Sequence, residues 1–408
     1  MMQDENRLKQ ELDAKKLQLH WLLQITKAIN YNLPSSNLFD IYQSVLRNQL
    51  RVGRVLLVVN EGGWHIPFSY GLDSNGIPSD STTLLEDIRS FSEELKPQSG
   101  WVTTFETIVP VMHQDVPLAY ALIGGLDEEV FHSKREIVTY IHTITNVIVV
   151  AIENKRLAKE SIRQAAMERE LQLAAQMQSM LFPADFVTHT FLDIAATYIP
   201  HQSVGGDYYD FIKLNDHEAL VCMADVSGKG LSAAMLMSNF QANLHAIIRH
   251  TEFTLQDLVF ELNACVNRSA QGEKFITFFV ARISGLTNTI NYINAGHNPP
   301  VLLHNDSVEM LEIGTTGLGM FEELPFLKSG STRFDKGSLL FCYTDGITDM
   351  ENLRGESFGS DNLERLLREH FSVESMRELH DRMVNYFDEY REGALFPDDV
   401  TFLSVRFS

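Results

Sequence analysis

The sequence predicts an α+β protein with two domains and a long helix between them. Three observations lead to this prediction. Residues 1–132 combine helical periodicity with a few strand-like segments, and residues 133–182 contain neither proline nor glycine. In residues 183–408 strand signals recur with helices among them, which is typical of sheets flanked by helices. We therefore expect domains at 1–132 and 183–408, joined by a helix over 133–182.

The N-terminal region begins with helices. Apolar residues recur every three or four positions between Leu19 and Ile29, Asn32–Ser36 interrupts the pattern, and a second helix is expected over Leu38–Leu50. Short segments with strand composition come next, and they predict a small antiparallel sheet. These segments are Arg54–Asn60, Trp64–Ser69, Ile108–Met112 and Leu118–Gly124.

A single helix is expected from Ser133 to about Leu181. Its first part carries an isoleucine stripe that can cover the N-terminal sheet, and its second part is rich in good helix formers with an imperfect heptad. Phe182 precedes a proline, which favours a helix end there. Because the helix far exceeds the usual ~8–20 residues, we expect a connector that pairs in a homodimer, with a coiled coil as one form of the pairing.

Composition restricts the partners. The 408 residues include 54 acidic and 33 basic side chains, for a formal net charge of −21. Such a chain is poorly suited to a nucleic-acid backbone, so no nucleic-acid partner is expected. No pair of the three cysteines has zinc-ligand spacing, and no signal peptide or apolar run of the ~20 residues that span a membrane is evident. The expected location is the cytoplasm, without a membrane span.

The most informative feature of the C-terminal region is a pair of aspartates on one hairpin. Two strand-like segments, Asp207–Leu214 and Glu218–Asp225, are separated by a three-residue polar turn. If Leu214 pairs with Glu218, the same register places Asp207 opposite Asp225. Opposed side chains have Cβ atoms only ~4.5–5.5 Å apart. Two carboxylates at that separation repel one another unless a cation lies between them, so the pair predicts a metal site.

Two further aspartates lie at strand ends. Asp345 follows an apolar strand, and Asp398 precedes the last strand of the chain. A single aspartate in such a place is more often a turn or cap residue. Together with the opposed pair, however, these residues can form a four-carboxylate site at one rim of a sheet sandwich. Oxygen ligands of this kind suit Mg²⁺ or Mn²⁺.

Five motifs occur in an order that resembles the SpoIIE-type branch of the PPM (protein phosphatase 2C-like) serine/threonine phosphatases. They are Val204–Asp210, Ala224–Met235, Asn294–Pro300, Tyr343–Ile347 and Pro397–Thr401, preceded by a similar segment at Gln176–Pro183. The resemblance covers residues 170–408 and implies a PPM-type α-β-β-α sandwich with two metal ions between its sheets. It implies that Asp207 and Asp225 share the two ions with the Val226 carbonyl and that Asp345 and Asp398 complete the site. Asp399 is expected to support the site, with an exchange of roles between Asp398 and Asp399 as the alternative.

The resemblance also implies a reaction. Metal-activated water would hydrolyse a phosphoserine or phosphothreonine of a signalling protein, and the implied substrate is an anti-sigma-factor antagonist of the STAS type. His201 and His297 are the nearest candidates for a general acid. His297, with Asn298, is equally well interpreted as shaping a substrate groove. The sequence offers no obvious counterpart of the phosphate-binding arginine of some relatives.

The N-terminal region is similar to a GAF-type sensor domain in size and element order over residues 15–155. Its ligand or partner is unknown from the sequence. Trp64, Phe68 and Trp101 are candidates for a pocket, although ordinary core packing is the favoured interpretation. The resemblance implies that the sensor regulates the C-terminal domain.

Two other functions compete with this prediction. Gly205–Asp210 is similar to the Gly-Gly-Asp-Glu-Phe turn of diguanylate cyclases, but Tyr208 stands where those enzymes have a second acid. A phosphatase domain that has lost catalysis and acts as a scaffold is the non-enzyme alternative. The presence of aspartate at all four candidate positions argues against it.

Overall fold

The computed structural model describes residues 2–72, 77, 80–92, 101–113, 115–126, 134–183, 186, 191–250, 253–304, 307–370 and 373–408. The chain divides into two compact units, residues 1–166 and 167–408. The boundary lies inside helix α4 (Lys134–Ser179), which contributes residues to both units. Ser133, the expected first residue of this helix, lies outside the described residues.

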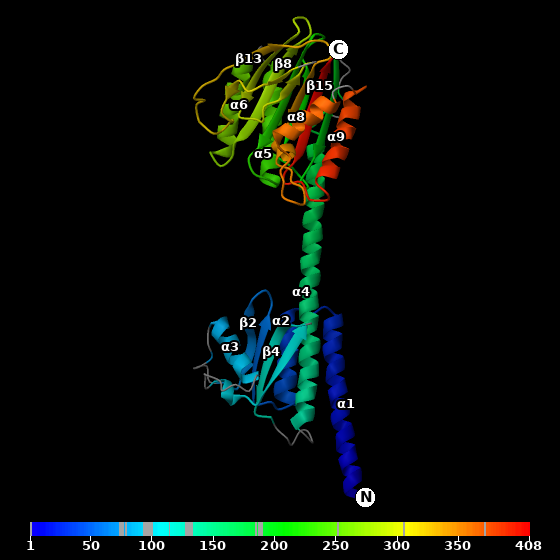
Figure 1. Ribbon diagram of the computed structural model, residues 1–408. Helices are drawn as coiled ribbons and strands as arrows, with labels where there is room; N and C mark the ends of the chain where they lie inside the picture. Colours follow the sequence, from blue (N-terminus) through cyan, green and yellow to red (C-terminus); the bar gives the residue numbers. More distant parts are fainter. Residues whose placement is uncertain are drawn as a thin grey trace. The chain divides into compact units, whose positions relative to one another are not determined.

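The N-terminal unit contains a four-stranded antiparallel sheet in the order β2-β1-β4-β3 (Figure 1). All four strands lie where the sequence predicts them, and their bounds differ from the prediction by at most two residues. They are β1 Arg54–Asn60, β2 Trp64–Tyr70, β3 Thr107–His113 and β4 Val116–Gly124. The helices of the unit are α1 (Met2–Asn30), α2 (Ser35–Ser44) with a π-helical turn at Val45–Gln49, α3 (Ser81–Ser92) and a 3₁₀ turn at Val102–Thr104.

Helices cover both faces of this sheet. One face packs against α1, α2 and α4 through a core that includes Ile25, Val55 and Ile141. The other face packs against α3, with Leu56, Ile88 and Leu122 in its core. The sequence did not predict α3. A cavity of about 10 Å³ near Phe39 and Val59 has room for at most one water molecule.

The three candidate pocket aromatics are core residues. The β1–β2 register shifts between Leu57 and Val59, and this bulge lets Trp64 and Phe68 enter the cores on opposite faces. Trp64 stacks on Tyr120 with ring centroids 5.7 Å apart. The indole Nε1 of Trp101 donates to Asp87 Oδ2 at 2.8 Å. These contacts confirm core packing as the correct interpretation.

Helix α4 changes character along its length. Ile137, Ile144 and Ile148 are buried in the N-terminal unit, whereas Ile162 and Met167 are 72% and 64% exposed. By length and composition Arg135–Ser179 is able to cross a membrane, but its apolar first half is a core helix. The exposed apolar residues are compatible with the coiled-coil pairing expected from the sequence, which stays a prediction.

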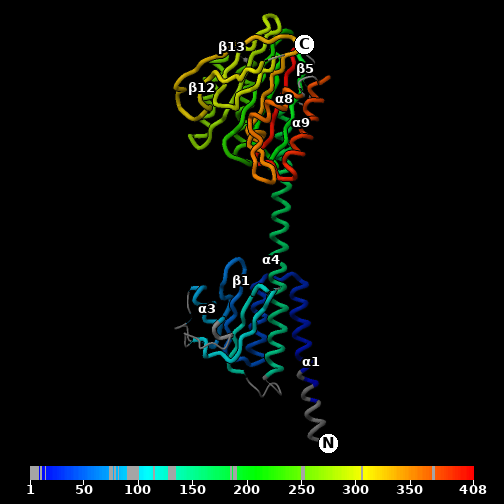
Figure 2. The backbone as a smooth tube through the Cα atoms, in the orientation of Figure 1, coloured from blue at the N-terminus to red at the C-terminus, as the bar shows by residue number. Residues whose placement is uncertain are grey.

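The C-terminal unit is a sandwich of two sheets. One sheet has the order β11-β10-β14-β15-β5, and the other has the order β12-β9-β8-β7-β6 with β13 also paired to β9. The strands are β5 Leu192–Ile199, β6 Tyr208–Lys213, β7 Glu218–Val226, β8 Ile276–Ser284, β9 Thr289–Ala295, β10 Val301–Leu303, β11 Val308–Met310, β12 Gly314–Thr315, β13 Gly330–Arg333, β14 Leu339–Tyr343 and β15 Val400–Phe407. Figure 2 shows that the C-terminal strand β15 lies beside β5, with which it pairs along its whole length.

Helices cover the outer faces of both sheets. They are α5 (Leu231–His250), α6 (Leu255–Ala270), α8 (Gly359–His370) and α9 (Met376–Tyr390), together with the single turn α7 (Asp345–Thr348). Helices α5 and α6 pack on the β6–β9 sheet, and α8 and α9 pack on the other sheet (Figure 1). Between the sheets lies an apolar core that includes Val221, Phe279 and Leu403. The predicted α-β-β-α sandwich is therefore confirmed.

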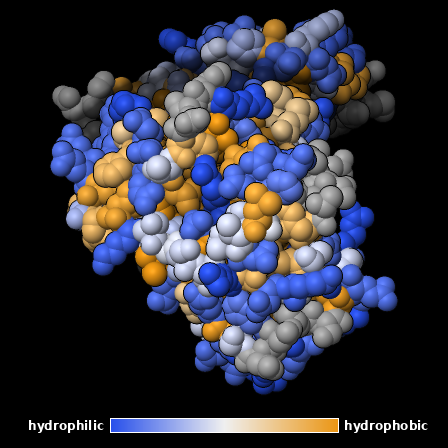
Figure 3. Space-filling model, turned by 90° about the horizontal axis from the view of Figure 1, so that it is seen from above, coloured by the Kyte–Doolittle hydropathy of each residue, from blue (hydrophilic) through white to orange (hydrophobic). Residues whose placement is uncertain are grey.

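The face of the molecule shown in Figure 3 is mainly hydrophilic. Hydrophilic side chains predominate on it, and hydrophobic ones form a few separate groups.

Candidate active site

The hairpin that carries the first two aspartates has the predicted register. Tyr208 pairs with Ala224, and Lys213 pairs with Ala219. At the turn, Leu214 N donates to Glu218 O at 3.0 Å. Continued by one residue, this register places Asp207 opposite Asp225, at the end of the hairpin away from the turn.

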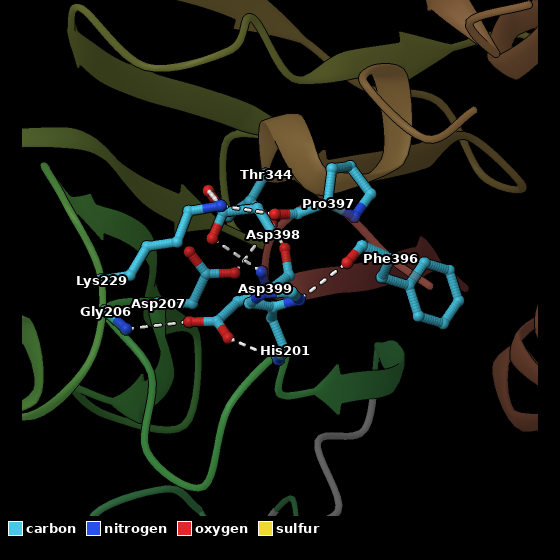
Figure 4. A network of polar contacts seen from close by, with 9 residues as sticks. All are labelled: His201, Gly206, Asp207, Lys229, Thr344, Phe396, Pro397, Asp398 and Asp399. Carbon is cyan, nitrogen blue, oxygen red and sulfur yellow. Dashed lines mark hydrogen bonds and ion pairs between the residues drawn. The ribbon is translucent and has the colours of Figure 1, made fainter. Parts of the chain in front are cut away.

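Asp207 is held from the opposite sheet. Its side chain is only 2% exposed. Its Oδ2 accepts a hydrogen bond from Thr344 Oγ1 at 2.8 Å and another from Thr401 Oγ1. Thr344 follows β14 and Thr401 lies on β15, so two hydroxyls from one side of the sandwich orient a carboxylate from the other. Figure 4 includes Thr344 and Asp207 of this group.

The four candidate aspartates lie within electrostatic range of one another. The pKa of Asp225 is raised from 3.8 to about 7, first by burial and then by the charges of Asp345, Asp398 and Asp399, while a hydrogen bond with Asp207 acts in the opposite direction. Burial raises the pKa of Asp207 well above its usual value, and Asp225 adds to the effect. These residues come from four separate segments of the chain, and their mutual repulsion is what a bound cation relieves.

Asp345 and Asp398 lie at the more open side of this cluster. Burial raises the pKa of Asp345, to which Asp349 and Asp398 contribute, while Lys229 lowers it. The Lys229 ammonium is 3.0 Å from Asp398 Oδ2 and also donates to the Pro397 carbonyl (Figure 4). The sequence did not single out Lys229, which supplies a positive charge beside the acidic cluster.

Asp399 has a different role from its neighbours. Its Oδ1 accepts from the backbone amide of His201 and its Oδ2 from that of Gly206, both at 2.8 Å (Figure 4). Hydrogen bonds to a charged carboxylate are stronger than neutral ones. Asp399 therefore holds the loop before Asp207 in place, in line with the supporting role inferred for it.

The loop before Asp207 has a second anchor on α4. Gln178, which is 6% exposed, donates from Nε2 to Gly205 O at 2.8 Å and accepts at Oε1 from Gly205 N at 3.2 Å. A Cβ atom on Gly205 would lie 2.1 Å from Asp399 Oδ2, so only glycine fits between the two anchors. The sequence included Gln178 only as part of a family-like segment and gave no sign of this contact.

The two candidate histidines differ in their surroundings. His201 is exposed, and its Nδ1 lies 2.7 Å from the Phe396 carbonyl. His297 is 5% exposed, and its Nδ1 lies 2.9 Å from Oγ1 of Thr277, the residue that pairs with Asp225 across β7 and β8. Burial lowers the pKa of His297 to about 4, so its ring is neutral near pH 7. The general acid remains a prediction.

The chemistry of the cluster fits a hard divalent cation. All of its side-chain donors are carboxylate oxygens, and Asp207 is buried and Asp225 partly buried, where unbalanced negative charge is costly. The Val226 carbonyl lies beside the glycine loop, 3.0 Å from the position of a Cβ on Gly206. Among the residues that the structure describes, no three His, Cys, Asp or Glu side chains already surround one point. The metal-ligand roles of Asp207, Asp225, Val226, Asp345 and Asp398 therefore stay a prediction.

Comparison with known proteins gives one family match. Residues 215–408 match the family "Stage II sporulation protein E (SpoIIE)", a segment that includes Asp225, Asp345 and Asp398 but begins after Asp207. Protein IcfG of Synechocystis is 25% identical over 339 residues, which are 75% of this chain and 52% of IcfG. Phosphoserine phosphatase RsbU of Bacillus subtilis is 25% identical over 293 residues, 70% of this chain and 82% of RsbU.

A solved structure supports the fold. The SiaA-PP2C domain of Pseudomonas aeruginosa superposes with a TM-score of 0.53 and 19% identity, covering 61% of this chain and 99% of that domain. The chain thus contains a complete counterpart of that domain, whereas it spans only about half of the length of IcfG.

Proposed function

We propose that this chain is a metal-dependent protein serine/threonine phosphatase, because residues 215–408 match the SpoIIE family, phosphoserine phosphatase RsbU is a relative, and the C-terminal unit has the fold of a PP2C domain. The observation that supports the proposal is electrostatic: Asp225 interacts with Asp345 and Asp398, and Asp207 interacts with Asp225. RsbU and RsbP of Bacillus subtilis are named phosphoserine phosphatases, which supports a phosphoserine or phosphothreonine substrate.

The chain's own residues define the geometry of the reaction. Two bound Mn²⁺ or Mg²⁺ ions would neutralise the phosphate and supply a nucleophilic water at neutral pH. Thr344 and Thr401 orient the Asp207 carboxylate through its Oδ2. Lys229 provides a positive charge at the open side, where a phosphate dianion would arrive. No side-chain nucleophile is required.

The partner and the regulation belong to the same proposal. The expected substrate is a phosphorylated anti-sigma-factor antagonist of the STAS type. A GAF-like N-terminal unit would regulate turnover in a cytoplasmic homodimer by ordering residues 227–250 through α4. Support comes from α4 itself, which contributes both to the core of the N-terminal unit and to the Gln178–Gly205 contact.

Phosphate release tests the proposal directly. The full chain is incubated with a serine-phosphorylated STAS-domain protein, with and without Mn²⁺. We expect release only with metal, and loss of about 10²-fold or more for Asp345→Asn because a metal-bound charge is removed. The circular dichroism of the variant should match that of the wild type. Absence of metal-dependent release would favour the scaffold alternative, and undiminished turnover by Asp345→Asn would refute the site.

Deletion of residues 1–155 tests the regulatory part. A changed turnover rate is expected. Identical activity and oligomeric state in the truncated and full chains would contradict regulation by the N-terminal unit.

A further inference from the structure

An open cavity of about 420 Å³ lies on the C-terminal unit beside the carboxylate cluster. Its volume is within the ~300–1,000 Å³ range of pockets that hold small ligands. Three segments contribute most of its walls: the β9–β10 connection, the end of β14 with α7, and the start of α8. The lining residues that matter below are His297, Asn298, Pro299, Tyr343, Thr348 and Ser360.

The cavity shares two walls with the candidate active site. Thr348 closes the single turn α7 that begins at Asp345, and its Oγ1 donates to the Asp345 carbonyl at 3.1 Å. On the other side, His297 contacts Thr277, which pairs with Asp225. One helical turn of four residues is about 6 Å long. An extended peptide advances ~3.3–3.6 Å per residue. If the phosphorylated residue of the substrate lies at Asp345, the residue one or two positions along the peptide therefore reaches the cavity.

The chemistry of the walls differs sharply from that of the cluster. Every residue that lines the cavity is uncharged near neutral pH, since the buried His297 ring is neutral. Asn298 and Ser360 offer hydrogen-bonding groups, and Pro299 with Tyr343 offers apolar surface. Without a cation among these residues the walls have no means of binding a second phosphate. They suit a short stretch of peptide with small, uncharged side chains.

We infer that this cavity binds the uncharged residues next to the phosphorylated serine or threonine of the protein substrate. The inference rests on the proposed function and adds a substrate preference to it. Charged residues at these positions would lose their hydration without gaining a partner in the cavity, so they are disfavoured.

A bulky substitution at the rim tests the inference. Ser360 is exposed at the start of α8, so Ser360→Trp can fill the cavity without disturbing the core. The matched control is Glu369→Trp, also exposed and about 13 Å further along the same helix. Two probes are compared with Mn²⁺ present: p-nitrophenyl phosphate, and a capped Ala-Ala-phosphoserine-Ala-Ala peptide.

The expected result is a change in preference. In Ser360→Trp, kcat/KM for the peptide relative to kcat/KM for p-nitrophenyl phosphate should fall about tenfold, mainly through KM. Glu369→Trp should leave this ratio as in the wild type. An unchanged ratio in Ser360→Trp overturns the inference, whether both substrates are unaffected or both are impaired equally.

A binding measurement separates this inference from the proposed function. In the full chain carrying Asp345→Asn, calorimetry gives the Kd of the phosphopeptide without turnover. Adding Ser360→Trp should raise this Kd about tenfold, which corresponds to ~1.4 kcal/mol. If the wild type hydrolyses neither probe but the Kd rises as expected, the proposed function is wrong and the cavity assignment is still supported. An unchanged Kd, or no peptide binding at all, overturns the cavity assignment.

Discussion

Gln178→Ala should loosen the loop that positions Asp207. The substitution removes both hydrogen bonds between α4 and Gly205, of 2.8 and 3.2 Å, and leaves the buried amide and carbonyl of Gly205 without these partners. A neutral hydrogen bond contributes about 0.5–1.5 kcal/mol net. The two together contribute about 1–3 kcal/mol to the local stability of the loop. The hydrogen bonds from His201 and Gly206 to Asp399 remain, so the loop loosens without the unit unfolding.

Hydrogen exchange measures this effect where it occurs. A loss of about 1–3 kcal/mol corresponds to ~5- to 150-fold faster exchange of the amides between His201 and Asp207. The affinity for Mn²⁺ should fall as well, because Asp207 is less well oriented. The control is Gln176→Ala, the same change at an exposed position two residues earlier on α4.

Two hydrogen-exchange results would contradict this role of Gln178. If Gln178→Ala and Gln176→Ala show the same exchange in residues 201–207, the Gln178–Gly205 contact does not hold the loop. If exchange accelerates over the whole C-terminal unit instead, the contact supports the fold as a unit and has no special relation to the site.

Two further predictions concern charge. The pKa of Asp225 in the folded chain is raised to about 7. In the metal-free protein, the protonated Asp225 carboxyl therefore contributes stability that is fully present below pH 3.8, the ordinary pKa of an aspartate. This stability is lost as the pH rises through about 7. Mn²⁺ requires the ionised form, so the Mn²⁺-induced rise in Tm, followed by circular dichroism, should grow from about pH 5 to pH 8, and a pH-independent rise would contradict the pKa assignment. Lys229→Met should raise the pKa of Asp345 and shift the pH of half-maximal Mn²⁺ binding upward. The control is Lys213→Met, which removes only an exposed ion pair with Asp216. Equal shifts in both variants would exclude a specific role for Lys229.

The sequence predicted the elements that depend on local pattern. The Asp207–Asp225 register followed from a short turn between two regular strands, and the structure has that register. Helix α4 ends two residues before the expected Leu181. In each of these cases periodicity or a turn decides the outcome within a few neighbouring residues.

Contacts between distant segments were not predictable in the same way. Thr401 lies 194 positions from Asp207, and Gln178 lies 27 positions from Gly205. The first contact depends on how the two sheets pack, and the second on how a helix packs against a loop. No local sequence pattern predicts either arrangement. A serine or threonine near the end of a strand is common, so Thr344 and Thr401 carried no signal beyond their place in family-like motifs. Helix α3 (Ser81–Ser92) was missed although Leu84, Leu85 and Ile88 have helical spacing, so here a local pattern was present and was overlooked.

The packing of Trp64 against Tyr120 and of Trp101 against Asp87 has a practical consequence. All three tryptophans of the chain, Trp21 included, belong to the N-terminal unit, and the C-terminal unit has none. Indole emission excited near the red edge of absorption therefore reports on one half of the molecule alone. A screen for effectors can therefore follow the tryptophan emission of the N-terminal unit without added dyes. Turnover in the C-terminal unit, which has no tryptophan, does not contribute to this emission directly.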